Sequence, residues 1–152
     1  MKPLLILSVI AFVSFCSRPG ERVAVADACQ KDDGTLLLVE GFLRPPNVMR
    51  TNVNPQTELM TYQLVLVDGS DEKSPSIETA VFGTRSNRTN RIAELSPEGF
   101  TESDLRIITD SGEVVGSLDR LRITGKLSKD EKDQFGEPCI LKIERIERPD
   151  LR

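Results

Sequence analysis

The chain has 152 residues, with 20 Lys and Arg, 24 Asp and Glu, and no histidine. Its length leaves room for one hydrophobic core, and its acidic balance argues against a general affinity for nucleic acid or for anionic lipid surfaces. The lack of histidine excludes Ser-His and Cys-His nucleophile pairs and removes the usual zinc ligand, so we expect neither a metal nor a cofactor.

Residues 1–16 have the pattern of a secretory signal. Lys2 is followed by an apolar run from Pro3 to Cys16, and polar residues begin at Ser17. A membrane-spanning helix needs roughly 20 apolar residues, so this run is too short to be one. We therefore expect an exported protein whose leader ends near Cys16.

Two cleavage sites compete at the end of this leader. The stretch Val13-Ser14-Phe15-Cys16 resembles the lipobox of bacterial lipoproteins, although Phe15 replaces the small residue that usually precedes the cysteine. The alternative is the A-x-A pattern that ends at Ala26, where signal peptidase would release a soluble periplasmic or secreted protein. A charged spacer separates Ala26 from the apolar run, so we favour the lipobox. It implies a lipid such as palmitate on Cys16, which would anchor the protein to the membrane.

The segment between this anchor and the first strand candidate, residues 17–34, is mostly polar and predicts a tether. It contains Cys29, and Cys139 opens the last strand candidate. If the end strands are neighbours in the fold, a disulfide between these two cysteines would close a loop of more than a hundred residues and leave Cys16 free for acylation. The alternative is that Cys29 and Cys139 are separate buried thiols.

Five segments have the composition of β-strands, because they are rich in β-branched and large apolar residues and end at glycine, proline or polar turns. The first is almost continuously apolar, as expected for a strand that is covered on both faces. The last two alternate apolar with polar residues, which indicates one buried face. The segments are residues 35–43, 61–69, 78–84, 118–128 and 139–147.

Residues 90–116 have a different pattern. The stretches Ser96-Pro97-Glu98 and Thr101-Glu102-Ser103-Asp104 each place acidic residues after a hydroxyl, as at a helix N-terminus, and together predict one short helix. Two short apolar stretches then flank Asp110-Ser111-Gly112, which predicts an extra hairpin.

Five strands with a short helix after the third is the order of an OB-fold, a small Greek-key barrel. Gly41 and Gly125 come late in predicted strands, where a tightly coiled barrel strand needs a bulge or bend. In the spacing of VEG, NRIAEL, SDLRI, DSGE, LRITGKLS and CILKIERIE, residues 29–148 resemble the OB-fold domains of uncharacterised exported bacterial lipoproteins. The resemblance implies a mainly β, OB-fold-like barrel over residues 35–148 and a tail at 149–152. A β-sandwich is the alternative.

The candidate ligand-binding residues follow the third predicted strand. Residues 84–91 place Arg85, Arg88 and Arg91 three positions apart. On an OB-fold this region adjoins the face that binds oligonucleotides or oligosaccharides, and guanidinium groups suit phosphate or acidic sugars. Most of the phenylalanines lie in apolar patterns, so Tyr62 is the one ring that we expect to be a surface platform for stacking. The alternative is a solvated loop whose arginines pair with nearby acids.

The carboxylate pairs Asp32-Asp33 and Asp71-Glu72 lie in polar loops, whereas an acid-base pair needs burial to separate its two pKa values. We therefore expect a non-enzymatic, membrane-tethered lipoprotein that binds a protein or glycan of a bacterial cell envelope. The alternative is a periplasmic or surface protein that binds oligonucleotides or oligosaccharides, with nucleic acid disfavoured by the acidic composition.

Overall fold

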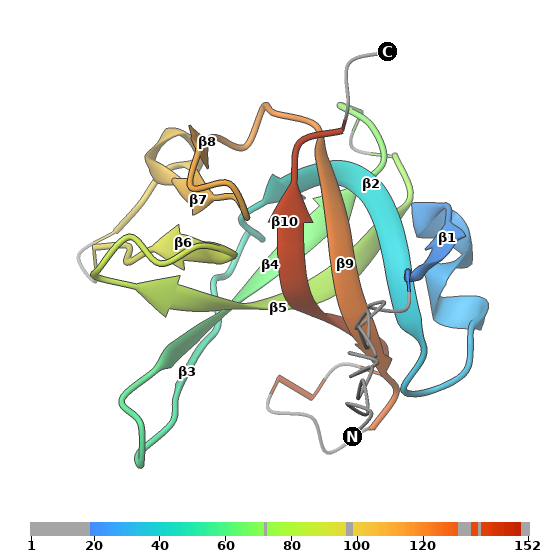
Figure 1. Ribbon diagram of the computed structural model, residues 1–152, viewed down its shortest axis with the longest axis horizontal. Helices are drawn as coiled ribbons and strands as arrows, with labels where there is room; N and C mark the ends of the chain where they lie inside the picture. Colours follow the sequence, from blue (N-terminus) through green and yellow to red (C-terminus); the bar gives the residue numbers. More distant parts are fainter. Residues whose placement is uncertain (1–18, 72, 97–98, 131–134, 137, 150–152) are drawn as a thin grey trace, which may run out of the picture.

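The computed structural model describes residues 19–71, 73–96, 99–130, 135–136 and 138–149, and five of its strands close into a β-barrel (Figure 1). Each strand pairs with the next around the ring, and the last pairs with the first. All neighbours are antiparallel except β5 and β10, which run parallel. The ring order is β2 (Leu36–Arg44), β4 (Met60–Val67), β5 (Ser76–Thr84), β10 (Ile140–Glu147) and β9 (Leu121–Ser128).

These barrel strands confirm the five predicted strand segments, with ends that differ by at most three residues. The closed ring of pairings excludes the alternative β-sandwich and is compatible with an OB-like fold. No helical turn in the described part of the chain is both long enough and apolar enough to span a bilayer.

Alternate residues of each strand fill the interior of the barrel. On β9 the apolar residues Leu121, Ile123 and Leu127 are buried, as their alternation predicts. On β2 alternate positions are fully buried and the others are half-buried, so the expectation of two covered faces is corrected. The reason is that β2 lies in a barrel wall, where one face points into the core and the other points outward.

Two glycines allow the barrel strands to approach one another closely, as predicted. A Cβ atom at Gly41 would lie 2.4 Å from the carbonyl oxygen of Val67, and one at Gly125 would lie 2.7 Å from that of Lys142. Opposite Gly125, β10 has a register shift between Ile143 and Arg145. This bulge explains why the buried positions Leu141, Ile143 and Ile146 depart from strict alternation along β10.

The segment that was expected to be a tether is in part folded against the barrel. Strand β1 (Glu21–Val23) pairs in parallel with β2, and the 3-10 turn η1 (Val25–Gln30) buries Val25 and Ala28 in the main core. Figure 1 shows both elements on the outer side of β2. The pairing of β1 with β2 and the burial of these two small apolar side chains attach a mostly polar segment to the barrel.

Residues between β5 and β9 form a small sheet beside the barrel. Its strands are β6 (Arg91–Ala93), β7 (Ile107–Ile108) and β8 (Val114–Val115), and the 3-10 turn η2 (Glu102–Asp104) lies between β6 and β7. Pro97 and Glu98 of the predicted helix lie outside the described residues. In its described part there is a single 3-10 turn, capped at Thr101, whose N–H donates to the Asp104 carboxylate at 2.6 Å. The predicted hairpin is confirmed as the antiparallel pair β7 and β8.

Candidate ligand-binding site

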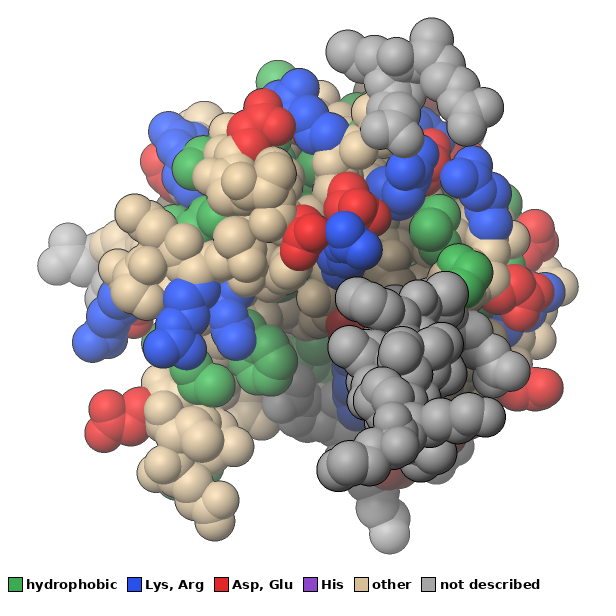
Figure 2. Space-filling model, viewed as in Figure 1, with side chains coloured by type: hydrophobic (Ala, Val, Ile, Leu, Met, Phe, Trp, Pro, Cys, Tyr) green, Lys and Arg blue, Asp and Glu red, His purple; other side chains and the backbone are tan. Residues whose placement is uncertain are grey.

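A pocket of about 760 Å³ lies between a projecting hairpin and the chain that follows β5. We call it the arginine pocket, because Arg85, Arg88 and Arg91 all contribute to its lining. Figure 2 shows Lys and Arg side chains gathered above the projecting hairpin on the left of the molecule. The other lining residues are Val53, Thr57, Glu58, Leu59, Met60, Gly83, Thr84, Ser86 and Glu94.

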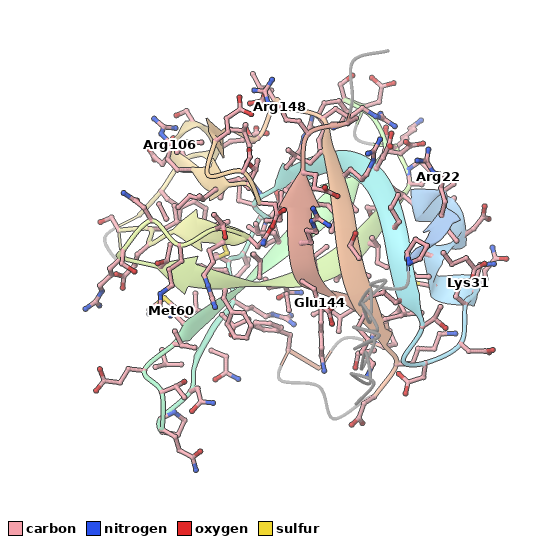
Figure 3. The ribbon with its side chains drawn as sticks, viewed as in Figure 1. Arg22, Lys31, Met60, Arg106, Glu144 and Arg148 are labelled. Carbon is pink, nitrogen blue, oxygen red and sulfur yellow. A yellow bond between two sulfur atoms is a disulfide. The ribbon has the colours of Figure 1, made fainter. Side chains whose placement is uncertain are left out.

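One wall of the pocket is the hairpin formed by β3 (Thr51–Val53) and the start of β4. Strand β3 is not among the five predicted strand segments. The register pairs Val53 with Met60, and Figure 3 shows Met60 near the base of this hairpin. The Asn54 side chain accepts hydrogen bonds from the backbone N–H groups of Gln56 and Thr57 and so shapes the turn. An Asn-Pro pair before a polar loop, flanked by β-branched residues, is a signal that could have predicted it.

The opposite wall is the segment from Gly83 to Glu94. Asn87 and Asn90 have φ angles of 52° and 57°, a left-handed conformation that asparagine tolerates better than most residues. The Asn90 amide donates to Asp110 at 2.9 Å, and its oxygen accepts the N–H of Ile146 at 2.7 Å. These two hydrogen bonds attach the pocket wall at Asn90 to β10 and to the small sheet.

Arg85 pairs with Glu94 from the same wall. Its Nε and NH2 groups both donate to the carboxylate, the second at 2.9 Å, which is the bidentate geometry of a guanidinium and a carboxylate. The hydrogen bond lowers the pKa of Glu94 and raises the pKa of Arg85, so both groups are charged near neutral pH. Arg85 is therefore already neutralised within the protein.

Arg91 and Arg88 are not neutralised in this way. The Arg91 guanidinium lies over the Phe82 ring, 4.7 Å from its centroid. Its NH1 atom is buried and has no hydrogen-bond partner among the described residues. Burial and the charge of Arg88 together lower the pKa of Arg91. Arg88 is exposed and makes no hydrogen bond or ion pair with a residue that the structure describes.

Tyr62 is not the surface platform that the sequence suggested. Its side chain is 2 % exposed and belongs to the main core, with the same alternation as Leu64 and Leu66 on β4. The phenol oxygen accepts the backbone N–H of Leu95 at 3.2 Å, and burial raises the pKa of the phenol. The ring packs against Gly83, where a Cβ atom would lie 2.5 Å from it.

The phenylalanines are less buried than their apolar sequence patterns indicate. Only Phe135 is buried among Phe42, Phe82, Phe100 and Phe135, and Phe82 is 42 % exposed. The residues at alternate positions of β5, including Val81, face the core, so Phe82 between Val81 and Gly83 faces outward. Arg91 covers one face of its ring.

Cys29 and Cys139 form a disulfide, as the sequence predicted. It joins η1 to the chain just before β10, where Cys139 packs against the main core. Cys16, the predicted lipidation site, lies outside the described residues, as does Glu72 of the Asp71-Glu72 pair. The described residues contain no group of three or more Cys, Asp and Glu side chains placed to hold a metal ion.

A second hollow, of about 290 Å³, lies near β1 and has its arginines compensated by acids. Glu40 pairs with Arg22, Arg120 and Arg122, and the Arg122 Nε donates to it at 3.1 Å. Arg120 also lies 3.6 Å from Asp68. Because these guanidiniums already have carboxylate partners, the arginine pocket is the better candidate for a ligand.

The chain was compared with protein-family models and with curated proteins, and none of them matches it. The geometry of the arginine pocket and the sequence are therefore the support for a ligand-binding role.

Proposed function

We propose that this protein is a non-enzymatic lipoprotein of a bacterial cell envelope, tethered through Cys16, whose barrel binds another envelope component in the arginine pocket. The main support is that one pocket is lined by all three predicted arginines. It adjoins β4 and β5, the second and third barrel strands, and the loop between the first and second. OB-folds use this strand face and this loop to bind oligonucleotides and oligosaccharides.

The chemistry of the pocket supports binding. Glu94 would need a raised pKa to act as a general acid near neutral pH, but Arg85 holds it ionised. The pair instead fixes the position of both side chains on the pocket wall. Cations, hydroxyls and a few apolar groups around one hollow are the mixture that orients a bound ligand.

Photocrosslinking in intact cells tests the binding role with the full-length protein. A photoreactive amino acid at Ser86, which is exposed in the arginine pocket, should become attached to an envelope component. The matched control is Asp32, which is also exposed and follows Lys31 on the opposite flank of the barrel (Figure 3). Attachment at residue 86 and not at residue 32 supports the proposal. Equal attachment at both positions, or none at residue 86, overturns it.

The proposed tether has a separate test. Mass spectrometry of the protein purified from membranes should find a diacylglycerol on Cys16. A mature protein that begins at Asp27, after the A-x-A pattern, would show that the anchor is absent and that the soluble alternative is correct.

A further inference from the structure

We infer that the ligand of the arginine pocket is an acidic glycan, a sugar chain with spaced carboxylates, and that Arg88 and Arg91 bind one of these carboxylates together. This inference rests on the proposed binding function and adds the chemical class of the ligand. Four observations carry it: two guanidiniums without acidic partners among the described residues, hydroxyls and carboxylates around them, the lack of a described aromatic residue in the lining, and the size of the pocket.

The first observation is a pair of arginines that have no acidic partner among the described residues. Arg91 has a buried NH1 without a partner among the described residues, and Arg88 lines the same pocket. The charge of Arg88 contributes to the lowered pKa of Arg91. A buried donor without a hydrogen bond costs free energy, and so does the approach of two like charges. One carboxylate bound by both guanidiniums would remove the repulsion and give the Arg91 side chain an acidic partner. Stacking on Phe82 holds Arg91 in place before the ligand arrives.

The second observation concerns the other polar groups of the pocket. Thr57, Thr84 and Ser86 bring hydroxyls, and Glu58 and Glu94 bring carboxylates. Sugar hydroxyls can donate to carboxylates and exchange hydrogen bonds with protein hydroxyls. A polymer with a phosphate at every unit would instead be repelled by Glu58 and by the formal net charge of −4. Spaced negative charges therefore fit better than a continuous polyanion.

The third observation is that no aromatic side chain is among the described residues that line the pocket. Single-stranded nucleic acids bind through aromatic side chains on which bases stack. Tyr62 is buried, and Arg91 lies over Phe82. The pocket thus offers cations and hydroxyls without a stacking platform.

The size of the pocket agrees with a short segment of such a polymer. Sites for small ligands have volumes of about 300 to 1,000 Å³. The arginine pocket, at about 760 Å³, lies in the upper part of that range. Leu59 and Met60 add apolar surface at its base, against which the less polar face of a sugar ring can pack.

The test is isothermal titration calorimetry of the exported full-length protein with acidic oligosaccharides at low ionic strength. The probes are oligomers of galacturonate, alginate and hyaluronan, with methyl-esterified galacturonate as the uncharged counterpart and oligo-dT as the nucleic acid. We expect at least one acidic glycan to bind, and its ester or neutral analogue to bind at least tenfold more weakly. Loss of a charged hydrogen bond by Arg88→Gln should also weaken binding about tenfold or more.

The matched control is Arg106→Gln. Arg106 is an exposed arginine of the small sheet, far from Met60 in Figure 3, and its substitution changes the net charge equally. Arg88→Lys keeps the charge but removes the planar fork, so it should recover only part of the affinity. Circular dichroism of each variant confirms folding.

Three outcomes would overturn the inference: no binding of any acidic glycan, equal effects of Arg88→Gln and Arg106→Gln, or tighter binding of oligo-dT than of every glycan. The last would identify a nucleic-acid protein. If crosslinking at residue 86 succeeds while all acidic glycans fail to bind, the proposed binding function stands and the class of ligand is wrong. If crosslinking also fails, the binding function itself is wrong.

Discussion

Removal of the disulfide is the perturbation whose effect the structure determines most directly. The bond joins Cys29 to Cys139, which are 110 positions apart, and the loop that it closes contains four complete barrel strands, β2, β4, β5 and β9. In the folded protein the two cysteines are held together by the packing of η1 and by the core contacts of Cys139. The bond therefore acts mainly by restricting the unfolded chain.

The magnitude follows from the length of that loop. In the chain-entropy treatment, a loop of roughly 110 residues corresponds to about 5 kcal/mol of stabilisation at 25 °C. Small domains unfold with free energies of about 5 to 15 kcal/mol, so loss of the bond should remove a third of the stability or more. With a urea dependence of about 2 kcal/mol per molar, the unfolding midpoint should fall by roughly 2 to 3 M.

The assay is urea unfolding, followed by circular dichroism, of variants in a Cys16→Ser background that prevents exchange with a third thiol. Cys29→Ser, Cys139→Ser and the double variant all remove the same bond, so they should lose nearly the same free energy of unfolding. A loss below about 1 kcal/mol would refute the chain-entropy reasoning. Additive losses from the two single substitutions would show that the cysteines contribute through separate contacts.

Three further substitutions test contacts in the barrel and the small sheet. Gly125→Ala would place a Cβ atom 2.7 Å from a carbonyl oxygen of β10, and we expect thermal unfolding to show a loss of about 1 to 3 kcal/mol; no loss would mean that the strands can separate without cost. Tyr62→Phe removes the acceptor of the Leu95 N–H, so urea unfolding should show a loss of about 1 kcal/mol, and an unchanged midpoint would argue against this bond. The hydrogen bond from Asn90, together with Arg145, lowers the pKa of Asp110 in the folded protein. The ionised Asp110 carboxylate therefore stabilises the fold fully above the ordinary pKa of 3.8, and this contribution is lost as the pH falls through the lower folded-state pKa. Unfolding free energies between pH 2 and 5 should therefore depend less on pH in Asp110→Asn, and parallel curves would contradict this.

The positions of the barrel strands follow from local composition alone. Segments such as residues 118–128 combine a strong alternation with turn residues at their ends, and tertiary contacts agree with these local preferences. The role of Gly41 and Gly125 could also be predicted from the sequence, because a glycine inside a strand commonly marks a bulge or a close approach of another backbone. The 3-10 turn after Thr101 and the hairpin around Gly112 carry similarly local signals.

The folded segment at residues 21–30 could not be predicted in this way. Its attachment depends on Val25 and Ala28, which are too small and too few to form a clear apolar pattern. Their burial becomes favourable only because β2 and the disulfide bring a barrel surface next to them. The short strand β3 likewise depends on β4, which supplies its hydrogen-bond partners.

For the candidate site, the sequence alone determined the residue types and their spacing: three arginines on one loop that follows a strand. Only the tertiary structure decided their roles, because each role depends on how the chain after β5 folds back and on which face of a strand a partner lies. Arg85 is neutralised by Glu94, whereas Arg91 lies on Phe82 with an unsatisfied donor. The facing hairpin turns the loop into a pocket. The same strand geometry buries Tyr62 and exposes Phe82, because a side chain's face depends on the register of the whole barrel.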